Sequence, residues 1–160
     1  MDVLILITGG TLDKVHDTLS ESLIFEGGQQ IGSVLARGRT QFPRLETLMQ
    51  VDSLDMTDTH RAEIIAAVRA APEDRIVITH GTGTMALTAQ ALATAHIGKT
   101  VVLTGAMRPH SLGQSDASFN VGGAVIAAQT LPPGIYGVMN GRVIPAANLH
   151  KNTQTGRFAD

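Results

Sequence analysis

The chain has 160 residues, a net charge of −2 and no cysteine, and 43% of its residues are hydrophobic. This length suits one domain with a core of its own, and the near-neutral charge gives no electrostatic reason to expect a nucleic acid or an anionic membrane as partner. Without cysteine, the chain has no disulfide, no thiolate metal site and no cysteine nucleophile.

The chain begins with an apolar run over residues 4–7 that stops at Thr8, two glycines and Thr11. Such a run predicts a buried parallel strand, and glycines directly after it allow a sharp turn and a close approach of a ligand. Ligands of open α/β sheets bind beyond the carboxyl ends of the strands, which places the Thr11 hydroxyl where a ligand would lie. A simple connecting turn fits the same residues, and the glycine spacing of nucleotide loops is missing.

Helices and strands alternate along the rest of the chain. The mixed polar stretch 12–28 is expected to be a long functional loop, of the kind that often forms a lid. Helices are expected over 31–36, from Thr57 or Asp58 to before Pro72, through 87–95 and over about 116–130. Strands are expected over 45–51, 75–79, 100–104 and 135–139, and residues 142–145 are expected to pair with the last of these as a hairpin. This order predicts one α/β domain over residues 1–160, a three-layer sandwich with a mainly parallel central sheet.

Three of the expected strands end in loops of similar composition, over residues 9–11, 81–84 and 105–106. The carboxyl ends of parallel strands meet at one edge of a sheet, so these glycine- and threonine-rich loops are expected to converge. That convergence favours a catalytic interpretation of Thr11 over a simple turn.

Five segments resemble, in this order, the bacterial-type L-asparaginase family of threonine amidohydrolases. They are residues 8–11 (TGGT), 52–56 (DSLDM), 78–85 (ITHGTGTM), 101–109 (VVLTGAMRP), and 138–140 (VMN) with 150–153 (HKNT). The resemblance extends from the first strand almost to the end of the chain. It implies the fold of the N-terminal domain of these enzymes and the hydrolysis of L-asparagine to L-aspartate and ammonia, with no cofactor, at a site near a subunit interface of a homo-oligomer.

The resemblance also assigns catalytic roles. Thr11 matches the nucleophile of the family, and Thr82 and Lys151 match two members of its second catalytic triad. A threonine hydroxyl needs activation, which a neutral lysine amine in a dry site can supply. Outside this motif, Lys151 would be interpreted as a solvated surface lysine.

The substrate-binding candidates are Gly10, Ser53, Gly81, Gly83 and Ala106. Ser53 matches a residue that holds the substrate α-carboxylate, and Ala106 matches a position whose backbone contacts the amide. Backbone N–H groups at residues 10–11 and 81–82 are candidates for an oxyanion hole. Ser53 is equally suited to cap the helix that follows it.

The chain departs from the family at two places. Gly83 stands where the family usually has an aspartate that pairs with the substrate ammonium, and the stretch 12–28 lacks the usual tyrosine. Asp13, Asp52 and Asp116 are alternative acids, although Asp116 is better placed to cap a helix; His16, Glu21 and Glu26 are alternative supports for Thr11. These departures keep open a weakened small-amide or amino-acid binding module, or a subunit of an amidotransferase-like assembly.

The remaining polar residues predict neither a metal site nor a membrane segment. The histidines at 16, 96, 110 and 150 lack metal-binding spacing, and His80, at the end of a buried strand, is expected to be structural. No basic leader precedes the first strand, and no apolar run spans a bilayer, so we expect a cytoplasmic protein, either a short natural member of the family or a piece of a longer one.

Overall fold

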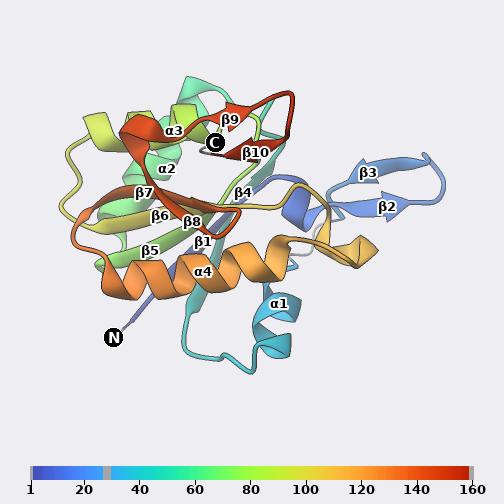
Figure 1. The fold of residues 1–160 in the computed structure, drawn as a ribbon, viewed down its shortest axis with the longest axis horizontal. Helices are drawn as coiled ribbons and strands as arrows, with labels where there is room; N and C mark the ends of the chain where they lie inside the picture. Colours follow the sequence, from blue (N-terminus) through green and yellow to red (C-terminus); the bar gives the residue numbers. More distant parts are fainter. Residues whose placement is uncertain (1, 27–29, 159–160) are drawn as a thin grey trace.

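The hydrophobic runs of the chain form one central sheet in the computed structural model, which describes residues 2–26 and 30–158 (Figure 1). Its strands are β1 (Leu4–Gly9), β4 (Arg44–Val51), β5 (Arg75–Thr79), β6 (Thr100–Thr104), β7 (Gly134–Met139) and β8 (Arg142–Pro145). They lie in the order β4-β1-β5-β6-β7-β8. The first five are parallel, and β8 returns antiparallel to β7 as the predicted hairpin partner.

Helices cover both faces of this sheet, as the alternation along β1 shows. Leu4 and Leu6 pack in one core cluster with residues of α2 (Asp58–Ala70) and α3 (Met85–Thr94). Ile5 and Ile7 pack in a second cluster with residues of α1 (Ile31–Arg37) and α4 (Ala117–Thr130), on the opposite face (Figure 1). Successive strand side chains point to opposite faces, so a nearly continuous apolar run fills both layers. The predicted three-layer α/β fold is confirmed. No helix in the described ranges is both long and apolar enough to cross a membrane.

The stretch expected to be a lid-like loop is largely structured. It forms the 3₁₀ helix η1 (Thr11–Asp13) and an antiparallel hairpin of β2 (Val15–Asp17) and β3 (Ser22–Ile24), which projects as an arm from the sandwich (Figure 1). Cross-strand pairing satisfies backbone groups that lie outside the core. Residues 27 and 28 of the expected loop lie outside the described residues.

The carboxyl-terminal part adds three short elements after β8. These are η3 (Ala146–Asn148) and the two-residue strands β9 (Lys151–Asn152) and β10 (Arg157–Phe158), which pair antiparallel. Another 3₁₀ helix, η2 (His110–Leu112), follows β6. Phe158 lies opposite Lys151 and is buried in the core cluster that contains α2 and α3, so the strand that carries Lys151 is anchored from within.

Candidate active site

Four chain segments meet at the carboxyl edge of the sheet. They follow β1, β4 and β5, and the fourth is β9. Gly10 has a φ of 89°, and a Cβ placed on it would lie 2.4 Å from Gly81 N. Only glycine fits such a close approach at a positive φ, so the loops after β1 and β5 touch backbone to backbone.

A small cavity of ≈260 Å³ opens between these segments. It is lined by Gly10, Thr11, Asp52, Ser53, Leu54, Gly81, Thr82, Gly83 and Lys151. Seven of the eight residues predicted from the sequence are therefore brought together. Ala106 is the exception: it is buried in the core cluster beneath α4 and does not line this cavity.

Lys151 and Thr82 meet inside this cavity. Lys151 Nζ donates a hydrogen bond to Thr82 Oγ1 at 3.0 Å, and the lysine is partly buried. A chain of amide contacts positions β9 and β10: Asn120 Oδ1 accepts from Asn140 N, and Asn140 Oδ1 accepts from Phe158 N at 3.0 Å. Thr11 lines the same cavity, so the candidate nucleophile and the candidate base lie on the same side of the sheet.

The hydroxyl of Ser53 joins the loops after β4 and β5 and does not cap a helix. Ser53 Oγ accepts a hydrogen bond from Gly83 N at 3.1 Å, and the Ser53 carbonyl accepts one from Thr84 Oγ1 at 2.7 Å. Thr57 provides the cap of α2. Because Ser53 Oγ accepts from the backbone, its own hydrogen is available to donate to a ligand carboxylate.

One backbone donor of the expected oxyanion hole is already engaged. Gly10 N donates to the Val51 carbonyl at 3.2 Å. The expectation that Gly10 N–H serves an oxyanion is therefore corrected, because the turn after β1 uses this group to bind β4. The N–H groups of Thr11, Gly81 and Thr82 are the candidates that remain.

The structure adds one residue that sequence analysis missed. Lys14, three positions after Thr11, forms a close hydrogen-bonded ion pair with Asp52 and lies 5.5 Å from the ring centre of Phe25. The hydrogen bond from Lys14 holds the pKa of Asp52 below its ordinary value. Lys14 precedes β2, so this pair fastens the base of the arm to the cavity. The sequence carried no signal for it beyond the proximity of Lys14 to Thr11.

The acids considered as replacements for the family aspartate have different positions. Asp52 lines the cavity. Asp13 is fully buried below it, and desolvation raises its pKa to about 6. Asp116 occupies the N-cap position of α4 without capping it, because its carboxylate accepts hydrogen bonds from Met107 N and Arg108 N.

The histidine and the arm residues considered in the sequence also lie away from the ligand space. His80 is fully buried, and desolvation lowers its pKa to about 4. Its ring nitrogens lie 2.8 Å from the Gly81 carbonyl and 2.8 Å from Thr88 Oγ1, which fits the expected structural role. His16, Glu21 and Glu26 are exposed and do not line the cavity. Among the described residues, no cluster of three acidic or histidine side chains could hold a metal ion.

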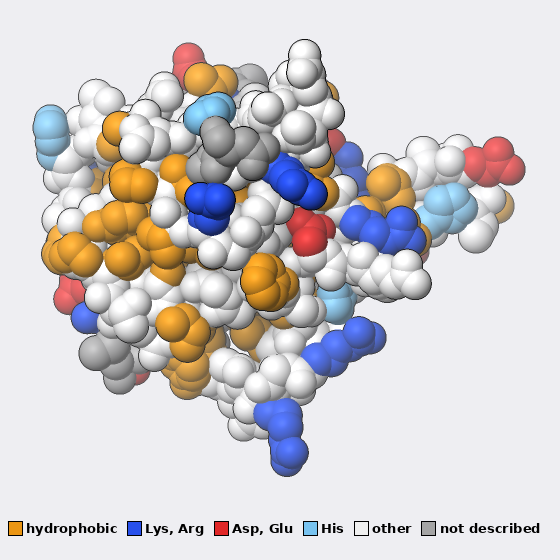
Figure 2. All heavy atoms as spheres, in the orientation of Figure 1, with side chains coloured by type: hydrophobic (Ala, Val, Ile, Leu, Met, Phe, Trp, Pro, Cys, Tyr) orange, Lys and Arg blue, Asp and Glu red, His pale blue; other side chains and the backbone are white. Residues whose placement is uncertain are grey.

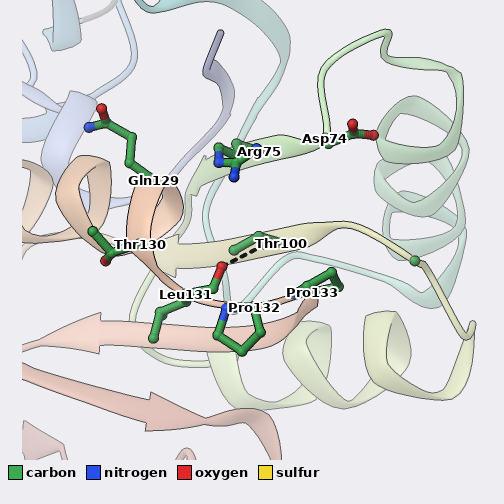
Figure 3. A pocket seen from close by; sticks show the side chains of 9 residues that line it. Asp74, Arg75, Thr100, Gln129, Thr130, Leu131, Pro132 and Pro133 are labelled. Atoms are coloured by element: carbon green, nitrogen blue, oxygen red, sulfur yellow. Dashed lines mark hydrogen bonds between the residues drawn. The ribbon is translucent and has the colours of Figure 1, made fainter. Parts of the chain in front are cut away.

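Another hollow lies at the opposite, amino edge of the sheet, with a volume of ≈500 Å³. Figure 3 shows Asp74, Arg75 and Thr100 beside the start of β5 and β6, with Leu131 and two prolines closing the other side. Thr100 Oγ1 donates to the Leu131 carbonyl at 3.2 Å, so this hydroxyl serves the connection between α4 and β7.

Comparison with known proteins agrees with this geometry. A model of the N-terminal part of asparaginases matches residues 2–159. A probable periplasmic L-asparaginase of Haemophilus influenzae is 31% identical over 165 residues, covering 96% of this chain and 47% of that protein. The thermostable L-asparaginase of Thermococcus kodakarensis superposes with a TM-score of 0.86 at 30% identity, covering 100% of this chain and 51% of that one.

A second kind of relative is a component of an amidotransferase. A glutamyl-tRNA(Gln) amidotransferase component from Aeropyrum pernix is 41% identical over 93 residues, which cover 54% of this chain and 22% of that protein. The chain thus spans about half the length of the asparaginases it matches, and less of the amidotransferase component.

Proposed function

Because this chain belongs to the asparaginase family, we propose that it hydrolyses a side-chain carboxamide of the L-asparagine type to a carboxylate and ammonia, with Thr11 as nucleophile. The observation that carries the proposal is the 3.0 Å contact of Lys151 Nζ with Thr82 Oγ1 in the cavity that Thr11 also lines. Family membership supports the reaction class, and this contact supports the division of roles.

The proposed reaction has two halves. The Thr11 hydroxyl oxygen attacks the amide carbon, and the Lys151 amine takes up the released proton through the Thr82 hydroxyl. The N–H groups of Thr11 and Thr82 stabilise the developing oxyanion. The C–N bond breaks, and the leaving nitrogen takes the proton and departs as ammonia. Water then attacks the Thr11 ester, releases the carboxylic acid and restores the hydroxyl.

The test is ammonia release by the purified chain from L-asparagine, L-glutamine and other small carboxamides. We expect time-dependent ammonia from at least one of them, and none from the Thr11→Val variant. The Thermococcus asparaginase, assayed in parallel, confirms that the conditions support turnover. Absence of ammonia with every amide, while that control reacts, would contradict the proposal and favour a binding module.

We further propose that the chain works as a homo-oligomer. Phe119 and Ile126 on α4 are 69% and 62% exposed, and they border a hollow of ≈580 Å³ that also includes Val143 on β8. Figure 2 shows hydrophobic side chains gathered on the face that carries β7, β8 and α4. Exposed apolar patches of this kind mark interaction surfaces. Light scattering at several concentrations tests this, and a strict monomer at all of them would contradict it.

The amidotransferase relative favours a second candidate, a subunit of a larger amidotransferase-like assembly. In that case the chain alone would be inactive or weakly active, and activity would depend on another protein. A homo-oligomer with full amidase activity would contradict this candidate. The cytoplasmic location stays a prediction, and the Haemophilus relative is named as periplasmic.

A further inference from the structure

The only carboxylate among the described residues that line the cavity is already engaged. Asp52 Oδ2 accepts a hydrogen bond from Lys14, and Asp52 Oδ1 accepts one from Leu54 N at 3.0 Å. Both oxygens are thus turned to groups of the protein. A ligand ammonium would have to compete with a lysine that is held in place and only 17% exposed at its side chain.

Asp13 and Asp116, the other two acids considered as replacements for the family aspartate, do not line the cavity. Asp13 is 0% exposed, and its Oδ1 accepts from Gln30 N at 2.7 Å. Asp116 is engaged by the loop after β6 and by Asn120 Nδ2.

The loop after β5 carries no acidic side chain, because Gly83 stands where the family usually has an aspartate. A Cβ placed on Gly83 would lie 2.9 Å from Ser53 Oγ and 3.1 Å from Leu54 Cδ2, so these two side chains lie where a side chain at position 83 would begin.

Groups that attract a ligand carboxylate are, by contrast, plentiful. Ser53 can donate its hydroxyl hydrogen, because its oxygen already accepts from Gly83 N. Lys151 lines the cavity and adds an amine, while Lys14 is paired with Asp52. A ligand ammonium would find the Asp52 carboxylate already bound to Lys14 and to Leu54 N, and an unpaired charge in a partly desolvated site is costly.

We propose that the site selects monoamides of dicarboxylic acids that carry no α-ammonium group, with succinamate preferred over L-asparagine. This inference rests on the proposed amidase function and names its substrate class. The two compounds differ only in the ammonium group. Hydrolysis of succinamate breaks its C–N bond, adds the oxygen of water to the carbonyl carbon, and yields succinate and ammonia.

Binding of the two matching products tests the inference independently of turnover. Calorimetry with the full chain should show succinate binding about 10-fold or more tightly than L-aspartate, the ratio expected when one charged group lacks a partner. Equal affinity, tighter binding of L-aspartate, or binding of neither would overturn it. Ammonia assays with succinamate and L-asparagine then report separately on the amidase proposal, which fails if neither amide reacts.

Two substitutions test whether the Lys14–Asp52 pair causes the preference for succinate over L-aspartate. Lys14→Met frees the Asp52 carboxylate, so the preference for succinate over L-aspartate should fall toward unity. Asp52→Asn should leave the preference intact, because Asp52 is not available to an ammonium in the parent chain. If Asp52→Asn instead weakens L-aspartate more than succinate, Asp52 is an ammonium acceptor and the inference is wrong.

A matched control comes from α2, where exposed Asp58 pairs with Arg61 at 3.0 Å. Asp58→Asn removes one carboxylate from an ion pair away from the cavity and should leave both affinities unchanged. Circular dichroism establishes that each variant is folded. If Lys14→Met does not fold, the result with Asp52→Asn still decides the question.

Discussion

The two edges of the central sheet each carry a hollow, and the larger one is not the candidate active site. At the amino edge, polar side chains bind backbone: Thr100 donates to the Leu131 carbonyl, and Lys99 Nζ donates to the Val68 carbonyl at 3.0 Å. At the carboxyl edge, Lys151 binds the Thr82 side chain inside the cavity. A group that satisfies a backbone carbonyl is committed to structure, whereas the Lys151 amine contacts a hydroxyl group of the cavity, with which it can exchange a proton. What the polar side chains bind, backbone or another side chain, therefore distinguishes the candidate active site from the other hollow better than volume does.

The strongest test of this difference exchanges one threonine at each edge. Thr11→Val removes the proposed nucleophile and should lower kcat by ~10³-fold or more. Thr130→Val, which borders the amino-edge hollow and donates to the Ile126 carbonyl at 2.9 Å, should leave kcat unchanged. Ammonia release measures both. Equal losses in the two variants would show that the edges do not differ in function.

A pair of lysines separates catalysis from stability. Lys151→Met should lower activity by about 10²–10⁴-fold, the usual contribution of general acid–base catalysis, with little loss of stability. Lys99→Met should lower the free energy of unfolding by about 1–3 kcal/mol, because it leaves the carbonyls of Val68 and Ala71 without their donor. Its activity per folded molecule should not change. Urea unfolding and ammonia release provide the two measurements, and the reverse pattern would contradict the assignment.

Two glycines, one at each edge of the sheet, allow the packing of the two edges to be compared. Gly10→Ala forces a Cβ against Gly81 at a φ of 89° and should cost more than ~2 kcal/mol of unfolding free energy. Gly98→Ala, beside the amino-edge hollow, meets nothing within 4 Å and should stay within ~0.5 kcal/mol of the parent. Urea denaturation of both variants decides this, and a stable Gly10→Ala protein would show that the loops can separate.

A pH-dependent effect is expected at the buried carboxyl group of Asp13. Burial raises the Asp13 pKa from 3.8 to about 6, so the folded chain holds this proton more tightly than the unfolded chain. Its contribution to stability is present below pH 3.8 and is lost as the pH rises through about 6. Asp13→Asn removes that loss and should raise the free energy of unfolding by up to ~3 kcal/mol at pH 7.5 relative to the parent.

The control for this prediction is exposed Asp74 at the amino edge. Asp74→Asn should stay within ~0.5 kcal/mol of the parent at both pH values, since it changes an exposed side chain. Urea unfolding at pH 4 and pH 7.5 compares all three proteins. If Asp13→Asn is less stable than the parent at pH 7.5, the carboxylate contributes more through Gln30 N than burial costs.

Much of the fold followed from periodicity alone. Residues 4–7 are apolar without helical spacing, and the structure shows them as a central strand with both faces covered. The strands near residues 75–79 and 100–104 were predicted with their observed bounds, because short β-branched runs next to glycine mark strand ends. The arm of β2 and β3 was expected as a loop, since its few residues carry mixed polarity and pair only with one another.

The sequence by itself determined that glycine- and threonine-rich loops end parallel strands, and parallel strands place those ends at one edge whatever the details of packing. It also identified Lys151, through a family resemblance and not through any local pattern. Only the tertiary structure decided which polar groups of the site are already hydrogen-bonded, ion-paired or buried, and so unavailable to a ligand. Sequence periodicity cannot reveal that Lys14 pairs with Asp52, that Gly10 N binds the Val51 carbonyl, or that Asp13 is desolvated. Each of these depends on the distance between separate loops and on how much water reaches them.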